Sequence, residues 1–311
     1  MRNSRRFALG ASVLALAIVA AACNSGGGGG GGNSSSPSAS PKPELTVGVS
    51  GAFAENQIVA EMYAQVLENA GYKVSRQLDL GSREISDKAL QEGQIDLKPE
   101  YLGSELLFLD PNGQGSGDPA AEAQALQPLL SAKGVTLLDY SQANDTNSFV
   151  VTQETADKYS LDTMSSLAPV AGQLTLGGPP ECPQRPFCIL GLKDTYGITF
   201  GHFKPLDVGG PLTVAALKNG DIDVGLLFST SSVIAANKWV VLQDDKQLQQ
   251  AENIAPVIRT DVLNDEIKNL LNAVSAKLTT DNITALNAKV EIDQEDPADV
   301  AKGFLQEQGL I

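Results

Sequence analysis

Apolar and polar residues alternate near residue 45, and the pattern then changes to a helical period. Residues 45–49 read Leu-Thr-Val-Gly-Val, which predicts a strand. After a glycine turn, Ile58, Met62 and Val66 recur four apart, which predicts a helix ending near Gly71. A strand, a glycine turn and a helix open an α/β unit, so the pattern favours the α/β class.

The same succession of elements continues along two stretches of the chain. In the first stretch we expect strands over 74–80, 95–97 and 135–138, with helices over 86–91 and 119–133. In the second we expect strands over 148–152, 198–200, 222–226, 239–242 and 256–258, with a helix over 211–218. The two stretches together predict two α/β lobes.

Beyond residue 258 the pattern is helical to the end of the chain. Val262, Ile267, Leu271 and Val274 fall on one face of a predicted helix. A third, all-helical domain is one interpretation of this tail. A return of the tail onto the first lobe suits its short length better.

The chain repeats one pattern in register, at residues 89–101 and 216–228. Each copy reads as a helix end, a glycine turn, a short strand containing Ile-Asp, and an aromatic residue, which is Tyr101 in one copy and Phe228 in the other. Ligands of open α/β sheets bind beyond the carboxyl ends of the strands, so the two aromatics are candidates to face one ligand from two lobes. The alternative is a generic helix-to-strand connection with both aromatics in the core.

The first 22 residues have the layout of an export signal. They carry arginines but no acidic group, and the apolar run over 8–22 is shorter than the roughly twenty residues that span a bilayer. Small residues directly before Cys23 resemble the bacterial lipobox, which implies a lipid on Cys23. An ordinary signal peptide with an incidental cysteine is the alternative, and Arg5-Arg6 leaves the general and the twin-arginine export routes open.

Residues 23–43 follow as a predicted tether rich in Gly, Ser and Pro, a composition that does not bury an apolar core. We therefore expect a folded module anchored by lipid to the outer face of the cytoplasmic membrane.

Charge and missing motifs exclude several classes of function. The chain carries 22 Lys and Arg against 37 Asp and Glu, for a net charge of −15, which argues against nucleic acid as a partner. It has a single histidine, His202, and no nucleophile elbow, phosphate loop or dinucleotide fingerprint. We therefore expect no enzyme activity, no cofactor and no metal.

Cys182 and Cys188 lie in a proline-rich segment, Cys-Pro-Gln-Arg-Pro-Phe-Cys. An exported protein meets an oxidising compartment, so the pair predicts a disulfide that closes a short loop. Zinc is the alternative, but it needs further ligands, and His202 stands at no recognised ligand spacing.

Tyr101, Tyr196 and Phe228 all lie next to glycine-rich turns and are candidates for an aromatic box. A quaternary ammonium has no hydrogen to donate, so proteins recognise it through π faces and shape. Core packing is the alternative for each aromatic taken singly.

Six segments of this sequence resemble the substrate-binding lipoproteins of osmoprotectant ABC importers, which bind glycine betaine, choline and carnitine. The segments are Phe-Ala-Glu-Asn-Gln at 53–57, Leu-Gly-Ser-Arg-Glu at 80–84, Gly-Gln-Ile-Asp-Leu-Lys-Pro-Glu-Tyr-Leu-Gly at 93–103, Asn-Asp-Thr-Asn at 144–147, Gly-Leu-Lys-Asp-Thr-Tyr-Gly at 191–197, and Gly-Asp-Ile-Asp-Val at 220–224 continuing to Phe-Ser-Thr at 228–230. They occur in the family's order and cover nearly all of residues 45–311.

The resemblance implies a two-lobed periplasmic-binding-protein fold of type II, with the ligand in the cleft between the lobes. Residues 45–146 together with 255–311 would form lobe one, and residues 147–254 would form lobe two. The implied partners are a quaternary ammonium ligand and an ABC permease in the membrane, with the receptor itself a monomer.

The family's pattern also implies a set of ligand-binding residues. It points to Phe53, Ser82, Tyr101, Asn144, Thr146, Tyr196 and Phe228. The sequence departs from the pattern at Phe228, where the family usually has a tyrosine, and in the loop that holds Cys182 and Cys188. Arg185 in that loop would favour a ligand carboxylate if it faces the cleft, whereas Glu84 would complement a cation.

The expected function is therefore an extracytoplasmic receptor that captures a quaternary-ammonium osmoprotectant and delivers it to a permease. A receptor for another small solute, such as an amino acid or a polyamine, is the first alternative. A surface adhesion module is the second.

Overall fold

The computed structural model of this protein describes residues 42–49, 53–112 and 115–311. The predicted signal peptide over 1–22, Cys23 and nearly all of the predicted tether over 23–43 lie outside the described residues.

The first of two mixed sheets has five strands in the order β2-β1-β3-β10-β4. β1, β2 and β3 are parallel, whereas β10 runs antiparallel to β3 and β4. The strands are β1 Glu44–Gly48, β2 Lys73–Gln77, β3 Leu97–Tyr101, β4 Val135–Leu137 and β10 Ile254–Arg259. β10 therefore returns to the first sheet after the chain has built the second.

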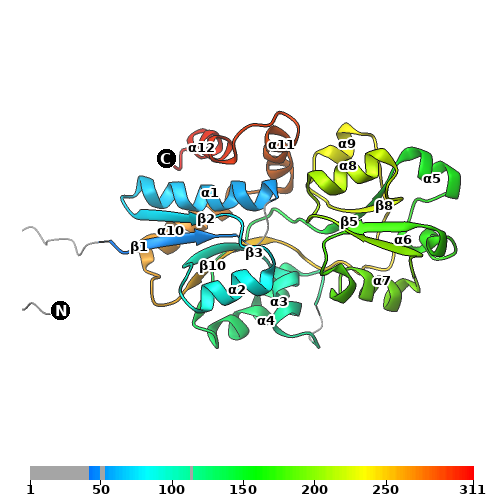
Figure 1. Ribbon diagram of the computed structural model, residues 1–311. Coiled ribbons are helices and arrows are strands. Elements are labelled where there is room, and N and C mark those ends of the chain that lie inside the picture. The colour runs from blue at the N-terminus through cyan, green and yellow to red at the C-terminus, as the bar shows by residue number, and fades with distance from the viewer. Residues whose placement is uncertain (1–41, 50–52, 113–114) are drawn as a thin grey trace, which may run out of the picture. The chain divides into compact units, whose positions relative to one another are not determined.

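Helices pack on both faces of the first sheet and bury a separate core on each (Figure 1). One core lies under α1 Ala54–Asn69, α10 Asp265–Ser275, α11 Thr280–Glu291 and α12 Pro297–Glu307. The other lies under α2 Arg83–Gln91, α3 Leu102–Leu109 and α4 Pro119–Ser131. The sheet and these seven helices form lobe one.

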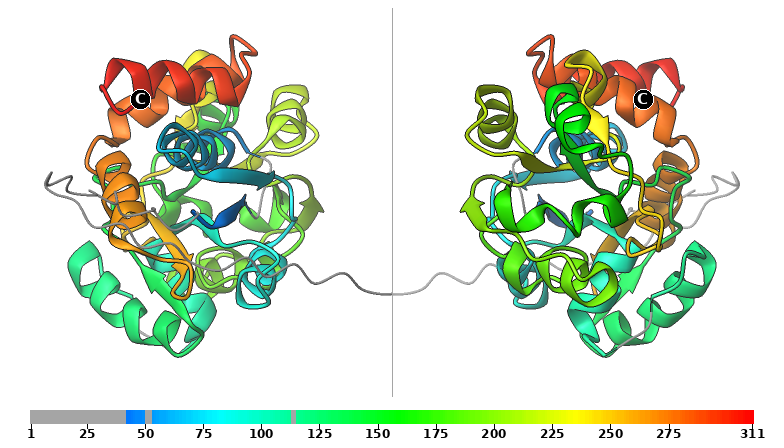
Figure 2. Two further views of the ribbon diagram at one scale, coloured as in Figure 1. Left: turned by 90° about the vertical axis from the view of Figure 1, so that its left-hand side faces the viewer. Right: turned by 90° about the vertical axis from the view of Figure 1, so that its right-hand side faces the viewer.

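The C-terminal helices belong to lobe one and do not form a third domain. α12 packs across α1 (Figure 2), and Val300, Phe304 and Leu305 are buried in the same core as the residues of α1. The helical tail therefore packs on the first sheet.

The second sheet also has five strands, in the order β7-β6-β8-β5-β9. They are β5 Asn147–Val151, β6 Thr175–Gly178, β7 His202–Pro205, β8 Val224–Phe228 and β9 Val240–Val241. Its helices are α5 Gln153–Tyr159, α6 Met164–Leu167, α7 Ile189–Tyr196, α8 Pro211–Asn219 and α9 Val233–Ala236, with 3-10 turns at Ala171–Gln173 and Cys182–Gln184. Here too the two faces of the sheet carry separate cores, and together they make lobe two.

The prediction of a strand over 198–200 is wrong, because the strand of this segment, β7, lies at His202–Pro205. Ile198 is apolar because it is buried in the core of lobe two directly after α7, which ends at Gly197 in a left-handed conformation (φ +69°). The strand β6 was missed because its sequence, Thr-Leu-Gly-Gly, shows no alternation of apolar and polar residues.

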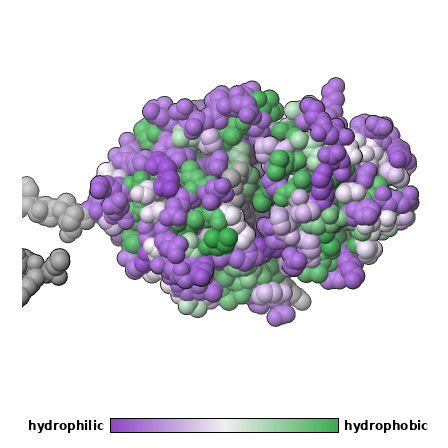
Figure 3. Space-filling model, viewed as in Figure 1, coloured by the Kyte–Doolittle hydropathy of each residue, from purple (hydrophilic) through white to green (hydrophobic). Residues whose placement is uncertain are grey.

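No helix within the described residues is both long and apolar enough to cross a membrane. On the face drawn in Figure 3, hydrophilic residues cover most of the surface and hydrophobic residues form small separate patches.

Candidate functional site

The chain passes between the lobes twice, over 138–146 and 242–253, and the two segments bond to each other. Asn144 pairs with Asn253 in an isolated antiparallel bridge, and the Asp145 amide donates to the Glu252 carbonyl at 3.0 Å. The Asn144 side-chain oxygen accepts from the Glu252 amide at 2.7 Å. Two short strands joined in this way form a hinge between the lobes.

A cavity of about 150 Å³ is lined by residues of both lobes. This volume is below the roughly 300–1,000 Å³ of pockets for drug-sized ligands, so it suits a smaller solute. Aromatic rings form much of its wall, from Phe53, Tyr101 and Phe108 in lobe one and from Phe187 and Phe228 in lobe two.

Three of these rings stack in a row across the cavity. The Phe53 ring centroid lies 4.9 Å from that of Phe228 and 6.4 Å from that of Tyr101, with interplanar angles of 28° and 29°. Tyr101 ends β3 and Phe228 ends β8, the equivalent positions of the repeated sequence pattern. The repeat thus brings one aromatic from each lobe to a shared cavity.

Two carboxyl groups are buried beside the aromatic row. Glu55, at the start of α1, accepts from the Tyr101 hydroxyl at 2.8 Å, and Asp145, at the hinge, accepts from the Thr230 amide at 3.1 Å. The Thr230 hydroxyl lies between them, 2.7 Å from a Glu55 oxygen and 2.9 Å from an Asp145 oxygen. The Asn287 amide also approaches Glu55, at 3.3 Å.

Burial raises the pKa of Glu55, and hydrogen bonds from Thr230, Tyr101 and Asn287 lower it by less. Burial, and then the nearby charge of Glu55, raises the pKa of Asp145 well above its ordinary value. Neither carboxyl belongs to any ion pair formed by the described residues. No cationic side chain of the described residues therefore neutralises these two carboxyl groups.

The two cationic side chains in the cavity wall are both paired. Arg83 bonds to Glu100 at 2.9 Å and lies 3.2 Å from Glu105. Arg185 bonds to Glu84 of the opposite lobe at 2.8 Å, and its guanidinium lies 5.9 Å from the Phe108 ring centroid. Arg185 and Glu84, which the sequence offered as alternative ligand partners, thus neutralise each other across the cleft.

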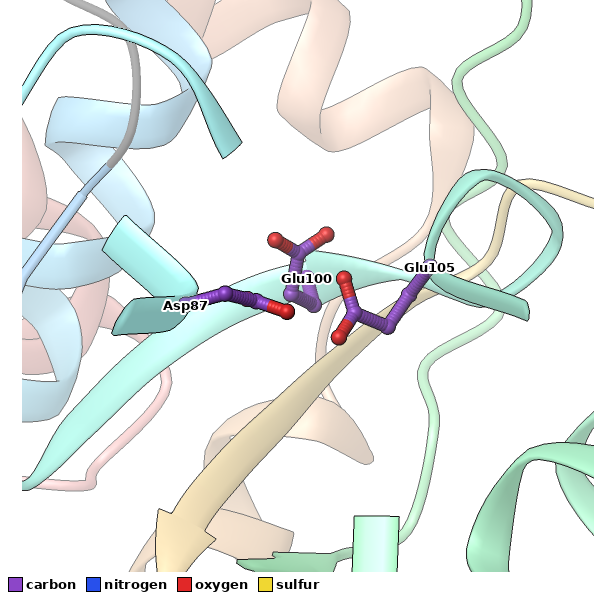
Figure 4. Close-up of side chains that lie close together, drawn as sticks. All are labelled: Asp87, Glu100 and Glu105. Carbon is purple, nitrogen blue, oxygen red and sulfur yellow. The ribbon is translucent and has the colours of Figure 1, made fainter. Parts of the chain in front are cut away.

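Asp87, Glu100 and Glu105 form the one cluster of possible metal-ligating groups within the described residues (Figure 4). The Lys98 ammonium lies among them, bonded to Asp87 and, at 2.7 Å, to Glu100. Burial raises the pKa of Glu105 well above its usual range, whereas Arg83 and Lys98 outweigh burial and lower that of Glu100 to about 2. The cluster is a buried salt-bridge network with its own cations, and it does not fit a metal ion.

Cys182 and Cys188 form a disulfide, with their Cα atoms 5.3 Å apart, and both line the cavity. Because the two sulfurs bond to each other, the zinc alternative does not apply to them. The disulfide-closed loop also presents the Phe187 carbonyl, which accepts from Asn147 at 3.3 Å and from Gln249 at 3.1 Å. A Cβ on Gly191 would lie 1.9 Å from the Pro186 carbonyl oxygen, so this loop needs glycine in α7 to pack where it does.

Four of the residues expected to bind ligand line this cavity, namely Phe53, Ser82, Tyr101 and Phe228. Asn144 and Thr146 lie at the hinge instead, and they line a second, polar cavity there. Thr146 bonds through its amide to the Ser229 hydroxyl at 3.0 Å.

Tyr196 does not line the cavity. Its ring is buried in the core of lobe two, because its hydroxyl bonds to the Asp244 side chain and accepts from the Lys246 amide at 2.7 Å. Phe53, Phe108 and Phe187 supply the aromatic surface that was expected from Tyr196.

The sequence prediction missed Glu55, Asp145 and Asn56. Asn56 lines the cavity, is 2% exposed, and its side-chain oxygen has no hydrogen-bond partner among the described residues. Glu55 and Asn56 lie inside the quoted segment at 53–57 and Asp145 inside that at 144–147, so the resemblance was the available signal for all three.

The two lobes, the two-stranded hinge and the cavity between them define a two-lobed solute-binding protein. The family model described as the substrate binding domain of the ABC-type glycine betaine transport system matches residues 43–307. The chain therefore belongs to this family of substrate-binding proteins of ABC transporters, which are receptors and not enzymes.

Curated relatives and solved structures agree with this family. The chain is 31% identical over 280 residues to a glycine-betaine-binding protein of Pseudomonas aeruginosa, covering 86% of this chain and 89% of that protein. It is 28% identical to a carnitine transport binding protein of Listeria monocytogenes, covering 88% and 89%. A crystal structure of a glycine betaine/carnitine/choline ABC transporter component shares 30% identity with a TM-score of 0.67, covering 86% of this chain and 99% of that one.

Proposed function

We propose that this protein captures a small quaternary ammonium solute in the cavity between its lobes and delivers it to its ABC permease. The observation that carries the proposal is the row of three rings, Phe53, Tyr101 and Phe228, beside two buried carboxyl groups. A methylated ammonium offers no hydrogen-bond donor, so π faces and shape are what a site has to recognise it with.

The free energy available from the aromatic faces and from burial of the ligand is sufficient for micromolar binding. Each desolvated aromatic face contributes on the order of 0.5 to 2 kcal/mol, and a micromolar dissociation constant corresponds to about 8 kcal/mol. Several faces together with burial of the methyl groups reach that range. The named relatives, which bind glycine betaine and carnitine, support the same ligand class.

The proposal includes the setting in which the receptor works. Cys23 would carry a lipid that holds a monomeric receptor on the outer face of the cytoplasmic membrane, and residues 24–43 would act as the tether. Lobe one would comprise residues 45–146 and 255–311, and lobe two residues 147–254.

A ligand panel tests the proposal. Choline, glycine betaine and carnitine are added to the protein, with arginine and putrescine as a comparison set, and the unfolding midpoint is followed. A ligand that binds the folded state alone raises the midpoint by mass action. We expect at least one methylated compound to raise it; if none does and another solute does, the ligand class is wrong.

Removing the rings singly tests the site. Phe53→Ala and Phe228→Ala are expected to weaken binding by roughly 10-fold or more, since each removes a face of about 0.5 to 2 kcal/mol and some burial. Tyr159→Ala is the matched control, because Tyr159 is a partly buried aromatic of lobe two that does not line the cavity. Calorimetric titration measures the affinities, and equal losses in all three variants would refute the assignment of the aromatic row.

A further inference from the structure

Three groups meet at the point where the two lobes contact the hinge. Glu55 comes from lobe one, Asp145 from the hinge and Thr230 from lobe two, and all three are at most 4% exposed. The Thr230 hydroxyl lies within hydrogen-bond distance of both carboxyl groups, at 2.7 and 2.9 Å. A hydroxyl carries one proton and donates to one acceptor only.

The second short contact therefore requires a proton on one of the carboxyl groups. If both carboxyl groups were ionised, the Thr230 hydroxyl would donate to one of them only. Its oxygen and the oxygen of the other carboxylate would then be two acceptors at hydrogen-bond distance in a buried site, which is strongly unfavourable. The pair thus holds one proton and one negative charge.

Asp145 has an oxygen that the protein does not use. Its Oδ2 is buried and accepts no hydrogen bond from the described residues, whereas its Oδ1 accepts from Ser229 and Thr230. Asp145 also lines the cavity beside Phe53 and Phe228. A buried, unpartnered carboxylate oxygen next to aromatic faces is an environment that attracts a cation.

An anionic group finds no equivalent partner in this cavity. Arg83 and Arg185 are the cationic side chains among the residues that line it, and each is held by a glutamate. Glu84 lies in the first turn of α2, so the N-terminus of this helix at Ser82 already has a negatively charged side chain beside it. Burial raises the pKa of Glu84, but hydrogen bonds from Ser82 and from its own amide outweigh burial, and the net shift is downward. A ligand carboxylate would have to displace one of these protein carboxylates.

We propose that Glu55 and Asp145 form a cation-recognition site that exchanges a shared proton for the positive charge of the ligand, so that the cavity prefers an organic monocation such as choline to a zwitterion. The inference rests on the proposed function, that the cavity binds a quaternary ammonium solute. The charges balance: the singly protonated pair carries −1, and after the O–H bond breaks and the proton passes to solvent, the −2 pair and the +1 ligand again total −1.

The groups that face the pair set the direction of its pH dependence. They are Tyr101, Thr230, Ser229 and Asn287, and the next charged group is Glu100, which lies near Tyr101. None of these groups is a cation. Burial raises the pKa of both carboxyl groups, and the charge of Glu55 raises that of Asp145 further, so both shifts favour a proton on the pair. Choline binding should therefore release a proton and should tighten as the pH rises.

The experiment compares three ligands in wild-type protein by calorimetric titration. The ligands are choline, glycine betaine and 3,3-dimethyl-1-butanol, which has the shape of choline but no charge. Titrations from pH 5.5 to 8, in buffers of different ionisation enthalpy, give the affinity and the protons released. We expect release of up to one proton per choline and an affinity gain of up to about 10-fold per pH unit, with no pH dependence for the neutral alcohol.

Two variants then locate the effect. Asp145→Asn should weaken choline binding roughly 30-fold or more, abolish the proton release, and change the affinity for the neutral alcohol by no more than a few-fold. Glu55→Gln should also abolish the proton release, which provides a second test if one variant folds poorly. Asp157→Asn, on the exposed face of α5, changes the net charge equally and should change none of these values.

The outcomes separate this inference from the proposed function. Choline binding without proton release and without a loss in Asp145→Asn would overturn the inference while the proposed function stands. Glycine betaine binding as tightly as choline would overturn the preference for a monocation. No binding of any methylated ammonium compound would instead overturn the proposed function.

Discussion

The aspartate of the repeated Ile-Asp pair has the same backbone role in both lobes. The Asp96 side chain accepts from the Thr46 amide at 2.8 Å, and the Asp223 side chain accepts from the Thr175 amide at 2.8 Å. Each aspartate thereby fixes the strand that follows it against its parallel neighbour. The position of the aromatic at the end of each strand, Tyr101 or Phe228, follows from this register.

Loss of Lys98 should strongly destabilise the protein. Lys98 is fully buried and bonded to Asp87 and Glu100, so Lys98→Met leaves the buried Asp87 carboxyl without its cation and Glu100 with Arg83 alone. We expect the free energy of unfolding to fall by about 3 to 5 kcal/mol. Urea unfolding measures it, with Lys88→Met on the exposed face of α2 as the control; a loss near that of the control would contradict the role of Lys98.

The hydrophobic pattern pointed to aromatic residues of the site, whereas its two acidic residues were marked only by the segments of the resemblance. Tyr101 and Phe228 lie just past predicted strands, and the carboxyl end of a strand is a place defined by pattern alone. Glu55 and Asp145 gain their character from burial and from Thr230 and Asn287, which are far away in the sequence. In a chain with 37 acidic residues, composition does not single out two of them.

At the scale of elements, the disulfide-closed loop over 182–188 forms part of the cavity wall. It supplies Cys182, Arg185, Phe187 and Cys188 to the wall, and its Arg185 bonds to α2 in the other lobe. The hydrophobic pattern predicted most strands, because the central strands are buried on both faces and read as short apolar runs. It did not predict α7, whose sequence includes Gly191, a residue needed for packing against this loop.

Replacing both cysteines, Cys182→Ser with Cys188→Ser, should weaken ligand binding more than it weakens the fold. The loop is short, so loss of its closure costs roughly 2 kcal/mol of stability. Its flexibility would loosen a wall of the cavity, and we expect an affinity loss on the order of 10-fold. Titration before and after reduction of the wild type gives an independent measurement, and unchanged affinity in both would show that the loop is not part of the binding surface.

At the scale of the whole molecule, the two sheets share one arrangement. Three parallel strands, in the order β2-β1-β3 or β7-β6-β8, are followed by one strand that runs antiparallel to them, β10 or β5. The α/β class followed from the order of predicted elements, whereas the return of the tail was expected from its short length. The pairing of Asn144 with Asn253 was not predicted, because a contact between two irregular segments leaves no periodic pattern.

The stability of the folded protein should fall as the pH rises from about 4.5 to 7. Burial raises the pKa of Glu252 from 4.5 to about 7, so the folded state holds a proton there that the unfolded state releases. The stabilisation is complete below pH 4.5 and is lost as the pH rises through 7, and for Glu252 it amounts to about 3 kcal/mol.

Urea unfolding at several pH values checks this linkage. Glu252→Gln should flatten the dependence between pH 4.5 and 7, and Glu295→Gln, on an exposed segment, should leave it unchanged. Stability that rises over this interval would contradict the assignment.

The equivalence of Asp96 and Asp223 has a consequence for redesign. Because each aspartate holds its own strand, the aromatic that ends that strand is mounted separately in its lobe. Tyr101 and Phe228 can then be substituted independently of each other to build receptors for new solutes.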